Sequence, residues 1–260
     1  MIPKKIHYCW FGGNPKPAIA KNCIKSWEKH CPDYKIVEWN ESNFDIDSAP
    51  LYVKQAYKVK KWAFVSDYVR LQIIYENGGI YLDTDVELVK NLDCLLNNNA
   101  YFGFEGNEYI NTGLGFGAEQ GNPIVFEMMQ DYMDIPFILE DGSFDVTPCP
   151  QRNTAVFLRH GLTRDGSTQL LDGDILIMSA EYLCPLDVAT KILHRSSNTF
   201  SIHRFDASWQ SEDQRKAHDK LARQRRINMR IKRVCYFPYW LMRKIIGDEH
   251  YEMIKRKLKR

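Results

Sequence analysis

Two aspartates, Asp83 and Asp85, follow directly on the apolar run of residues 80–82. In a strand, side chains at positions i and i+2 leave the same face about 7 Å apart, so both carboxylates can reach one divalent cation. Oxygen ligands of this kind suit Mg²⁺ or Mn²⁺, which also bind substrate phosphates. Two solvated turn aspartates would give the same pattern. The carboxyl end of a buried strand is where α/β sheets bind ligands, which favours a metal–diphosphate site.

The residues before this pair predict a buried helix over 63–75, because apolar side chains cover nearly every direction around it. Asp67 and Arg70 interrupt this apolar surface. They lie three residues apart, so they share a face of the helix and can pair, and buried Asp and Arg are rarely unpaired. Either they form a structural ion pair or they project together into a polar cavity. The neighbouring carboxylates favour the cavity.

The amino-terminal segment predicts a first buried strand over residues 5–10, closed by two glycines. Trp10 stands at its end, where an aromatic ring can stack on a flat base, and Gly12 lets a nucleotide approach the backbone closely. The other interpretation of Trp10 is a packed residue at the end of a strand. His7 points to the opposite face from Tyr8, and we expect it to be a core histidine with satisfied hydrogen bonds.

The rest of the chain alternates predicted helices and strands, which is typical of an α/β sheet. The strand–helix–strand opening favours a parallel sheet at its start. Segment 111–118, with glycines at alternate positions, predicts a strand with close backbone approach rather than a phosphate loop. We expect helices at 17–30, 51–60, 123–133 and 151–160, and further strands at 34–39, 80–85, 101–105, 172–178 and 201–203.

Composition limits the class of protein. The 260 residues can bury one substantial core, and 44% hydrophobic and 26% charged residues are ordinary for a soluble globular protein. No apolar run is long enough for a membrane helix, and the start of the chain does not resemble a signal peptide. The seven scattered cysteines indicate neither a zinc site nor a disulfide framework. We therefore expect a reduced, cytoplasmic location.

The motifs together resemble glycosyltransferase family 32. The pattern S-D-x-x-R at residues 66–70 is followed by Y-x-x-G-G-x-Y-x-D-x-D at residues 75–85. This order is similar to that of fungal outer-chain mannosyltransferases, bacterial capsule and lipopolysaccharide sugar transferases, and the catalytic core of clostridial glucosylating toxins. Residues 6–13, I-H-Y-C-W-F-G-G, match the family's opening segment, and I-H-x-x-x-x-S-W at residues 202–209 matches its late segment.

The resemblance implies roles for the central residues. Asp85, assisted by Asp83, would hold Mn²⁺ or Mg²⁺ against the leaving diphosphate of a nucleotide-sugar. Asp67 and Arg70 would hold the sugar hydroxyls, with help from Tyr81.

The resemblance also implies roles for the two ends of the domain. Trp10 would stack on the base, beside Tyr8 and Gly12. Asn111 would line the sugar site; the alternative is a turn residue that enters the following strand.

In the late segment, His203 would complete the metal shell or contact phosphate, and Ser208 would contribute a further contact. Trp209 would pack as a lid over the diphosphate. The alternative for all three is a loop docked by an anchoring tryptophan.

The carboxyl-terminal part differs from the rest in charge. Residues 210–260 hold 16 Lys and Arg against 6 Asp and Glu, whereas residues 1–209 hold 19 against 27. Cationic helices flank an aromatic and apolar patch at residues 235–242, which resembles a segment that binds a membrane surface. The other interpretation is a helical cap with a charged face. The acidic body argues against nucleic-acid binding.

We therefore predict a GT-A type, Rossmann-like mixed sheet flanked by helices over residues 1–210, and a basic helical extension over 211–260. The function that the resemblance implies is metal-dependent, retaining transfer of a sugar, with UDP-sugar as the expected donor. The acceptor would be a glycan or lipid-linked glycan in capsule or lipopolysaccharide synthesis, at the inner face of the cell membrane. The sequence leaves two alternatives open: a metal-dependent nucleotide-sugar hydrolase or phosphotransferase, and a non-catalytic nucleotide- or glycan-binding module.

Overall fold

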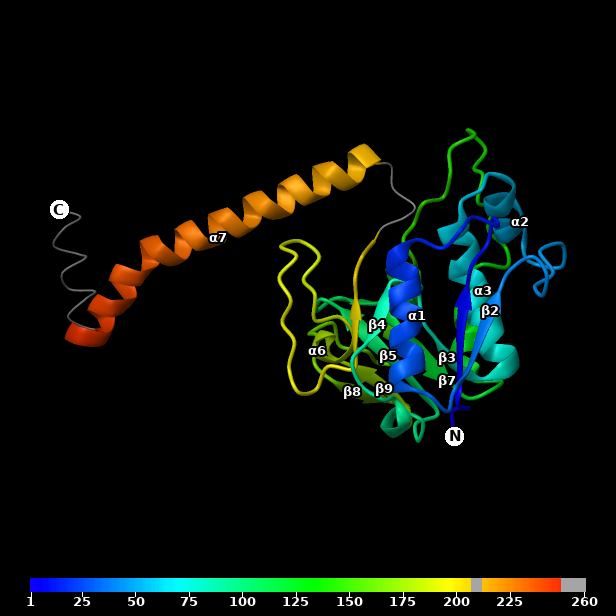
Figure 1. Cartoon of the computed structure of the whole chain (residues 1–260), viewed down its shortest axis with the longest axis horizontal. Coiled ribbons are helices and arrows are strands. Elements are labelled where there is room, and N and C mark those ends of the chain that lie inside the picture. The colour runs from blue at the N-terminus through cyan, green and yellow to red at the C-terminus, as the bar shows by residue number, and fades with distance from the viewer. Residues whose placement is uncertain (207–211, 249–260) are drawn as a thin grey trace. The chain divides into compact units, whose positions relative to one another are not determined.

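A mixed β-sheet forms the centre of the larger part of the chain (Figure 1). The computed structural model describes residues 1–206 and 212–248. Within them the sheet has eight strands in the order β2-β1-β3-β7-β5-β9-β8, with β6 paired to β5. A separate two-stranded sheet pairs β4 with β10. The strands are β1 (Lys5–Cys9), β2 (Lys35–Trp39), β3 (Gly79–Tyr81), β4 (Val86–Leu88), β5 (Ala100–Glu105), β6 (Tyr109–Ile110), β7 (Phe116–Ala118), β8 (Gln169–Leu171), β9 (Ile175–Met178) and β10 (Ser201–His203).

The sheet contains both parallel and antiparallel strand pairs. β1 pairs in parallel with β2 and with β3, as the strand–helix–strand opening predicts. β7 then runs antiparallel between β3 and β5, and β5 pairs in parallel with β9. The predicted mixed α/β sheet flanked by helices is confirmed. The helices are α1 (Ala18–His30), α2 (Leu51–Lys58), α3 (Trp62–Asn77), α4 (Pro123–Gln130), α5 (Cys149–Arg159), α6 (Ala180–Leu183) and α7 (Glu212–Ile246).

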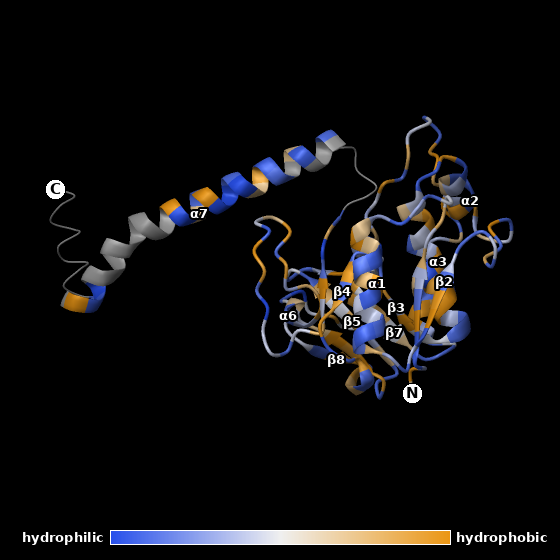
Figure 2. Ribbon diagram, in the orientation of Figure 1, coloured by the Kyte–Doolittle hydropathy of each residue, from blue (hydrophilic) through white to orange (hydrophobic). Residues whose placement is uncertain are grey.

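Two hydrophobic cores cover the sheet, because alternate residues of each strand face opposite sides. The larger core packs α2, α3, α4 and α5 against side chains such as Phe102. The smaller core packs α1 through Trp27 against Ile6 and Ile80. The hydrophobic colouring of Figure 2 is concentrated in the strands between these helices. α3, which is apolar on nearly every side, is the buried helix that the sequence predicts.

The chain groups into two compact units, residues 1–187 with 193–209, and residues 188–192 with 210–260. The second unit contains α7, a helix of 35 residues. Among the described residues, no helix combines the length and the apolar character that crossing a bilayer requires. The domain boundary at residue 210 stays a prediction.

The expected strand over residues 80–85 is wrong, since β3 ends at Tyr81. The backbone N–H of Val86 donates to the carbonyl of Asp83 at 2.9 Å, which closes a turn. The reason is topological: β3 pairs with β1 and β7, whereas β4 pairs with β10. Asp83 and Asp85 therefore lie on the link between two sheets, and the alternation of strand side chains does not position them.

The expected strand over residues 111–118 is also partly wrong. A 3₁₀ turn, Thr112–Leu114, comes first, and its backbone is capped by the Asn111 side chain, which accepts a hydrogen bond from the Gly113 N–H at 2.7 Å. Gly115 then has a φ of 109°, which returns the chain to β7. The left-handed region is accessible to glycine without steric penalty. Only residues 116–118 form the strand.

His7 is the satisfied core histidine that the sequence predicts. Its side chain is 1% exposed, its Nδ1 accepts from the indole N–H of Trp39 at 3.0 Å, and its Nε2 lies 3.1 Å from the carbonyl of Gly78. With Nδ1 an acceptor, Nε2 carries the proton and donates, so the ring is neutral. Burial is the main cause that lowers the pKa of His7 from 6.5 to about 4.

This shift predicts a pH dependence of folding. Between pH 6.5 and pH 4 the unfolded chain binds a proton at His7 that the folded chain does not, so the free energy of unfolding falls as the pH falls. The loss at pH 5 is about 2 kcal/mol from this residue. Urea unfolding at pH 7.5 and pH 5 should show a smaller acid-induced loss for His7→Gln than for the wild type. Equal losses in the two proteins would contradict the assignment.

Candidate active site

The guanidinium of Arg70 joins two carboxylates from different parts of the chain. Its Nη2 lies 2.9 Å from Asp67 Oδ1 on the same helix and 3.3 Å from Asp83 Oδ1 on the link after β3. Its Nε donates to the carbonyl of Ser66 at 2.9 Å. Arg70 is 3% and Asp67 is 9% exposed. The ion pair, one of the two alternatives that the sequence presents, is therefore present. The polar cavity stays a prediction.

Tyr81 completes the surroundings of Asp83. Its hydroxyl donates to Asp83 Oδ1 at 2.9 Å, and the Arg70 guanidinium lies 5.0 Å from the centre of its ring.

Burial raises the pKa of Asp67 to about 6, although Arg70 opposes this effect. Burial also raises the pKa of Asp83; Arg70 opposes it and the charge of Asp85 adds to it. Burial, and to a smaller extent the charge of Asp85, thus limit how easily Asp83 ionises.

Asp85 faces the two-stranded sheet instead. Its Oδ1 lies 3.0 Å from His203 Nε2, and its Oδ2 accepts from the backbone N–H of Asp206 at 2.9 Å. Burial would raise the pKa of Asp85, but the charge of His203 and these hydrogen bonds outweigh burial and lower it to about 2. Burial lowers the pKa of His203, but the charge and hydrogen bond of Asp85, together with the charges of Asp83 and Glu105, outweigh burial and raise it. β10 places His203 opposite Val86 at the start of β4.

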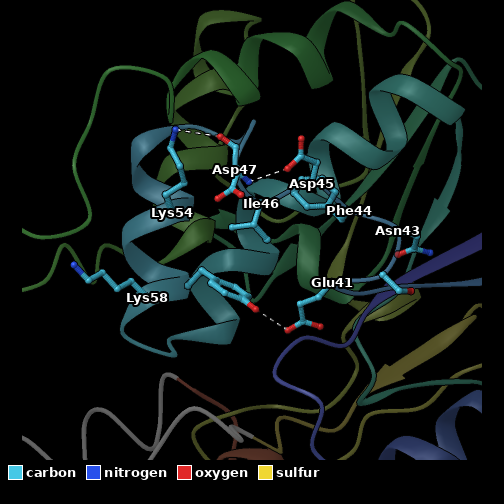
Figure 3. A pocket seen from close by; sticks show the side chains of 10 residues that line it. Glu41, Asn43, Phe44, Asp45, Ile46, Asp47, Lys54 and Lys58 are labelled. Atoms are coloured by element: carbon cyan, nitrogen blue, oxygen red, sulfur yellow. Dashed lines mark hydrogen bonds between the residues drawn. The ribbon is translucent and has the colours of Figure 1, made fainter.

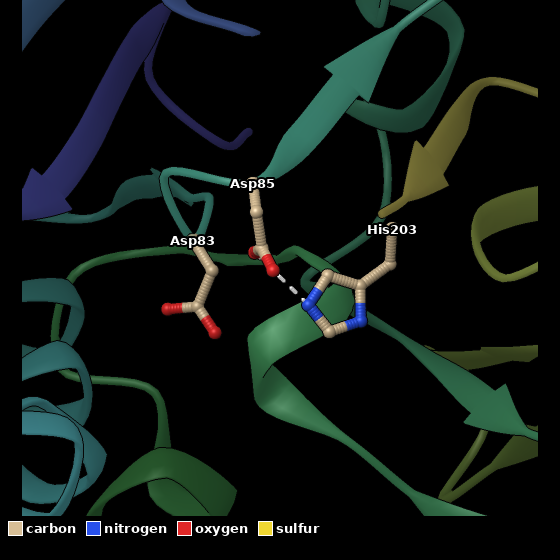
Figure 4. A group of neighbouring side chains, drawn as sticks. All are labelled: Asp83, Asp85 and His203. Atoms are coloured by element: carbon tan, nitrogen blue, oxygen red, sulfur yellow. Dashed lines mark ion pairs between the residues drawn. The ribbon is translucent and has the colours of Figure 1, made fainter. Parts of the chain in front are cut away.

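Asp83, Asp85 and His203 form a group with the chemistry of a divalent-cation site. One ligand atom from each lies within 4.8 Å of the other two. Figure 4 shows the two carboxylates and the imidazole turned toward a common space. Two carboxylate oxygens and one imidazole nitrogen suit Mn²⁺ or Mg²⁺. A cation here would also offset the repulsion between Asp83 and Asp85. The residues fit the metal that the sequence predicts.

The turn after β6 lies close to Asp83 of this group. A Cβ added to Gly113 would lie 2.5 Å from Asp83 Oδ2 and 3.1 Å from Arg70 Nη1. Asn111 holds the turn: its Oδ1 accepts from the Gly113 N–H, and its Nδ2 donates to Glu105 Oε2 at 2.6 Å. The alternating glycines predict close backbone approach, but nothing in the sequence predicts Asp83 as the neighbour. No sequence signal pointed to Glu105.

The predicted nucleotide residues lie around the end of β1. Trp10 is half-buried, its indole N–H donates to the carbonyl of Asn14 at 2.6 Å, and Lys16 Nζ lies 5.7 Å from the ring centres of both Trp10 and Tyr8. Tyr8 is buried under α1, and its hydroxyl donates to Glu38 Oε2 at 2.5 Å. The Tyr8 hydroxyl is therefore already committed inside the chain.

Gly12 follows Trp10 and is fixed from two sides. Its N–H donates to Glu41 Oε1 at 2.6 Å, and a Cβ at this position would lie 2.6 Å from the Trp62 ring. Its φ of 86° also favours glycine. Tyr57 donates to the same Glu41 oxygen at 3.3 Å. Glu41 thus connects the segment after Trp10 to α2.

Glu41 also borders an open pocket of about 840 Å³ between the loop after β2 and α2 (Figure 3). Its lining combines buried Phe44 with charged groups such as Asp47 and Lys54. None of Asp83, Asp85 and His203 lines it. The pocket is therefore a neighbour of the predicted base-binding segment and separate from the carboxylate group.

Part of the chain is similar to known glycosyltransferases. Residues 17–102 match the model of a glycosyltransferase sugar-binding region containing a DXD motif. We refer to these residues as the glycosyltransferase region. The resemblance to the glycosyltransferases with a D-x-D motif is confirmed.

The chain is similar to several individual proteins, each over a different share of its length. Inositol phosphoceramide mannosyltransferase 3 of Schizosaccharomyces pombe is 30% identical over 140 residues, which are 50% of this chain and 37% of the fungal protein. The chain thus spans little more than a third of that relative. Uncharacterized glycosyltransferase L373 of Acanthamoeba polyphaga mimivirus is 27% identical over 72% of this chain and 75% of its own. The solved PaToxG glycosyltransferase superposes with a TM-score of 0.47 at 18% identity, over 61% of this chain and 69% of that one.

The structure brings most of the predicted residues of the glycosyltransferase region together. Asp67, Arg70, Tyr81 and Asp83 are joined by direct contacts. Asp85 and His203 complete the group. Their roles toward substrate and metal stay predictions.

Other predicted residues lie apart from this group or beyond the description. Trp10, Tyr8 and Gly12 lie at the end of β1. Ser208 and Trp209 lie outside the described residues.

Gly113 offers a test of the crowding around Asp83. Gly113→Ala should force the Asp83 carboxylate to move and should weaken Mn²⁺ binding, measured by calorimetry, by about tenfold or more. Gly103→Ala is the matched control, because its Cβ would crowd apolar Leu183 at 2.9 Å and neither glycine has a positive φ. Both variants should lose about 1–3 kcal/mol of stability. Equal Mn²⁺ affinity in the two variants would show that Gly113 does not position Asp83.

Proposed function

We propose that the chain is a metal-dependent, retaining glycosyltransferase that uses a nucleotide-sugar donor, with UDP-sugar as the expected class. The observation that carries this proposal is the double contact of Arg70 with Asp67 and Asp83, next to the group of Asp83, Asp85 and His203. It places polar groups suited to sugar hydroxyls beside groups suited to a metal-bound diphosphate.

Each of these groups has one role in the proposal. Asp83, Asp85 and His203 would hold Mn²⁺ or Mg²⁺, which neutralises the charge that develops on the leaving diphosphate. Asp67 and Arg70 would bind and orient the sugar hydroxyls, since both are nearly buried and fixed by their mutual contact.

The nucleotide would lie toward the end of β1. Trp10 would stack on the base. Gly12 would hold the segment after Trp10 in place, because its missing side chain makes room for the Trp62 ring and its N–H donates to Glu41.

Retention of configuration is part of the proposal. Among the described residues, the carboxylates of the group are engaged: Asp67 and Asp83 by Arg70, and Asp85 by His203. None of them is a free nucleophile of the kind that retaining glycosidases use. We therefore favour attack by the acceptor hydroxyl on the same face of the sugar that the diphosphate leaves, guided by the leaving phosphate.

The acceptor would be a glycan or lipid-linked glycan. A role in capsule or lipopolysaccharide synthesis follows only from the resemblance to bacterial family members. The relatives described above include a mannosyltransferase, so GDP-mannose belongs in any donor screen beside UDP-sugars.

The decisive experiment combines donor and metal. Melting temperature is measured with UDP-glucose, UDP-galactose, UDP-N-acetylglucosamine and GDP-mannose, each with Mn²⁺ and with EDTA. A true donor stabilises the folded state by mass action, so we expect a rise only with Mn²⁺, and its loss in Asp83→Asn and Asp85→Asn. Sugar transfer by these variants should fall about 100-fold.

Three outcomes would contradict the proposal. Phosphate release without acceptor, insensitive to Trp10→Ala, would indicate a hydrolase. Donor binding that survives Asp83→Asn and Asp85→Asn without turnover would indicate a binding module. A product with inverted anomeric configuration, determined by NMR, would exclude retention.

We also propose that α7 binds an anionic membrane surface. Residues 220–233 contain seven Lys and Arg and no Asp or Glu. Ile227 and Ile231, one turn apart on the helix, are 41% and 54% exposed. Basic residues near anionic lipid contribute about 1 kcal/mol each, and apolar side chains can enter the headgroup region. This would place the enzyme at the inner face of the cell membrane.

Vesicle sedimentation of the full chain tests this surface. We expect binding to vesicles of phosphatidylcholine with phosphatidylglycerol, little binding to phosphatidylcholine alone, and weaker binding at high salt. Ile227→Ser with Ile231→Ser should reduce binding severalfold. Equal binding to neutral and anionic vesicles would refute the proposal.

A further inference from the structure

Several buried polar atoms have no hydrogen-bond partner among the described residues. Within residues 1–206 and 212–248, these atoms include the hydroxyls of Tyr52 and Tyr132, Arg152 Nε and Arg70 Nη1. Native proteins leave few such atoms, and each one calls for an explanation such as a ligand or a water. Three of them belong to side chains that pack on one another, which points to a common cause.

The Tyr52 and Tyr132 hydroxyls and Arg152 Nε come from three separate parts of the chain that pack together. Tyr52 lies on α2, Tyr132 follows α4, and Arg152 lies on α5. The two tyrosine rings pack edge to face, 5.2 Å apart, and are 0% and 1% exposed. The Arg152 guanidinium lies 5.6 Å from the centre of the Tyr52 ring and 5.4 Å from that of Tyr132.

Electrostatics connects this cluster to Asp67. After burial itself, the charge of Asp67 is the largest cause that raises the pKa of Tyr52 and of Tyr132. The charge of Arg152 in turn lowers the pKa of Asp67, though less than Arg70 does. The Tyr132 ring also lies 5.9 Å from the ring of Tyr68, the residue after Asp67 on α3. The cluster therefore packs against the part of α3 that carries the carboxylate we assign to the sugar hydroxyls.

The cluster has no surplus positive charge. Arg152 forms an ion pair with Asp145, and Arg70 is matched by Asp67 and Asp83. A carboxylate ligand, such as that of a uronic acid, would find no unmatched cation here. Phenol hydroxyls both donate and accept, and Arg152 Nε donates. A neutral O–H group is the chemistry that satisfies all three.

We propose that Tyr52, Tyr132 and Arg152 form a subsite behind Asp67 that binds a neutral hydroxyl and helps to select a neutral donor sugar. The inference rests on the function proposed above. The O–H group belongs either to the sugar itself or to an enclosed water that supports Asp67. Tyr52, Tyr132 and Arg152 are specificity-determining residues in both cases, because they act on the carboxylate that meets the sugar.

The test removes single hydroxyls. Tyr52→Phe and Tyr132→Phe are compared with the control Tyr68→Phe. Tyr68 is a buried tyrosine of α3 whose pKa is raised by burial and then by Glu76, without a contribution from Asp67. Affinities are measured with Mn²⁺ for two ligand pairs, UDP with UDP-glucose and GDP with GDP-mannose. The contribution of the sugar is the ratio of the dissociation constant of UDP to that of UDP-glucose, or of GDP to that of GDP-mannose. We expect this ratio to fall about five- to tenfold in the two test variants and to stay unchanged in Tyr68→Phe.

A second measurement needs no nucleotide, so it tests the subsite even if the donor class is different. Since neither hydroxyl has a partner within the described chain, Tyr52→Phe and Tyr132→Phe should leave the melting temperature unchanged or raise it. A crystal structure without and with donor separates the two sources of the O–H group: an ordered water that persists, or a sugar hydroxyl in its place.

Two results would overturn the subsite, and a third would overturn its preference for a neutral sugar. One is an unchanged sugar contribution to affinity in both test variants. The other is a lower melting temperature in both without any change in sugar affinity, which would assign the hydroxyls a structural role only. Tighter binding of UDP-glucuronate than of UDP-glucose by the wild type would overturn the preference for a neutral sugar.

Discussion

The buried guanidinium of Arg70 is the constraint on which the site depends. Arginine keeps its charge at all relevant pH values, and a buried charge is strongly destabilising unless it is paired. At 3% exposure Arg70 is matched by Asp67 on its own helix and by Asp83 after β3. The same pairing therefore satisfies a folding requirement and fixes two carboxylates of the proposed donor site. α3 and the link between the two sheets cannot shift independently.

Sequence reasoning succeeded where spacing along the chain determines the geometry. The Asp67–Arg70 pair follows from helical periodicity, because residues three apart share a face. The burial of α3 follows from its apolar surface, and the parallel pairing of β1 with β2 follows from a strand, a helix and a strand in succession. His203 came from the family pattern and from no spacing rule, since 118 residues separate it from Asp85.

What the sequence did not predict depends on contacts between distant segments. The turn at Asp83 arises because β3 and β4 join different sheets, and a short segment cannot encode its partner strands. The approach of Gly113 to Asp83 depends on the placement of β7 beside β3. The hydrogen bond from Asn111 to Glu105 depends on the pairing of β5 with β6. No sequence signal distinguishes Tyr52, Tyr132 and Arg152, because they come together only through the packing of α2, α4 and α5. Their common feature, an unpaired buried atom, exists only in three dimensions.

The link between the sheets also explains why two aspartates so close in sequence differ in electrostatics. Asp83 faces the main sheet, where Tyr81 and Arg70 contact it, while burial and Asp85 raise its pKa. Asp85 faces β10, where His203 and a backbone N–H keep it ionised. The backbone N–H of Arg204, the residue after His203, donates to the carbonyl of Asp85 at 2.9 Å. Within residues 201–206, the late segment thus contacts the carboxylate of Asp85 through His203 and the N–H of Asp206. The register of β10 on β4 therefore sets the distance between His203 and both carboxylates.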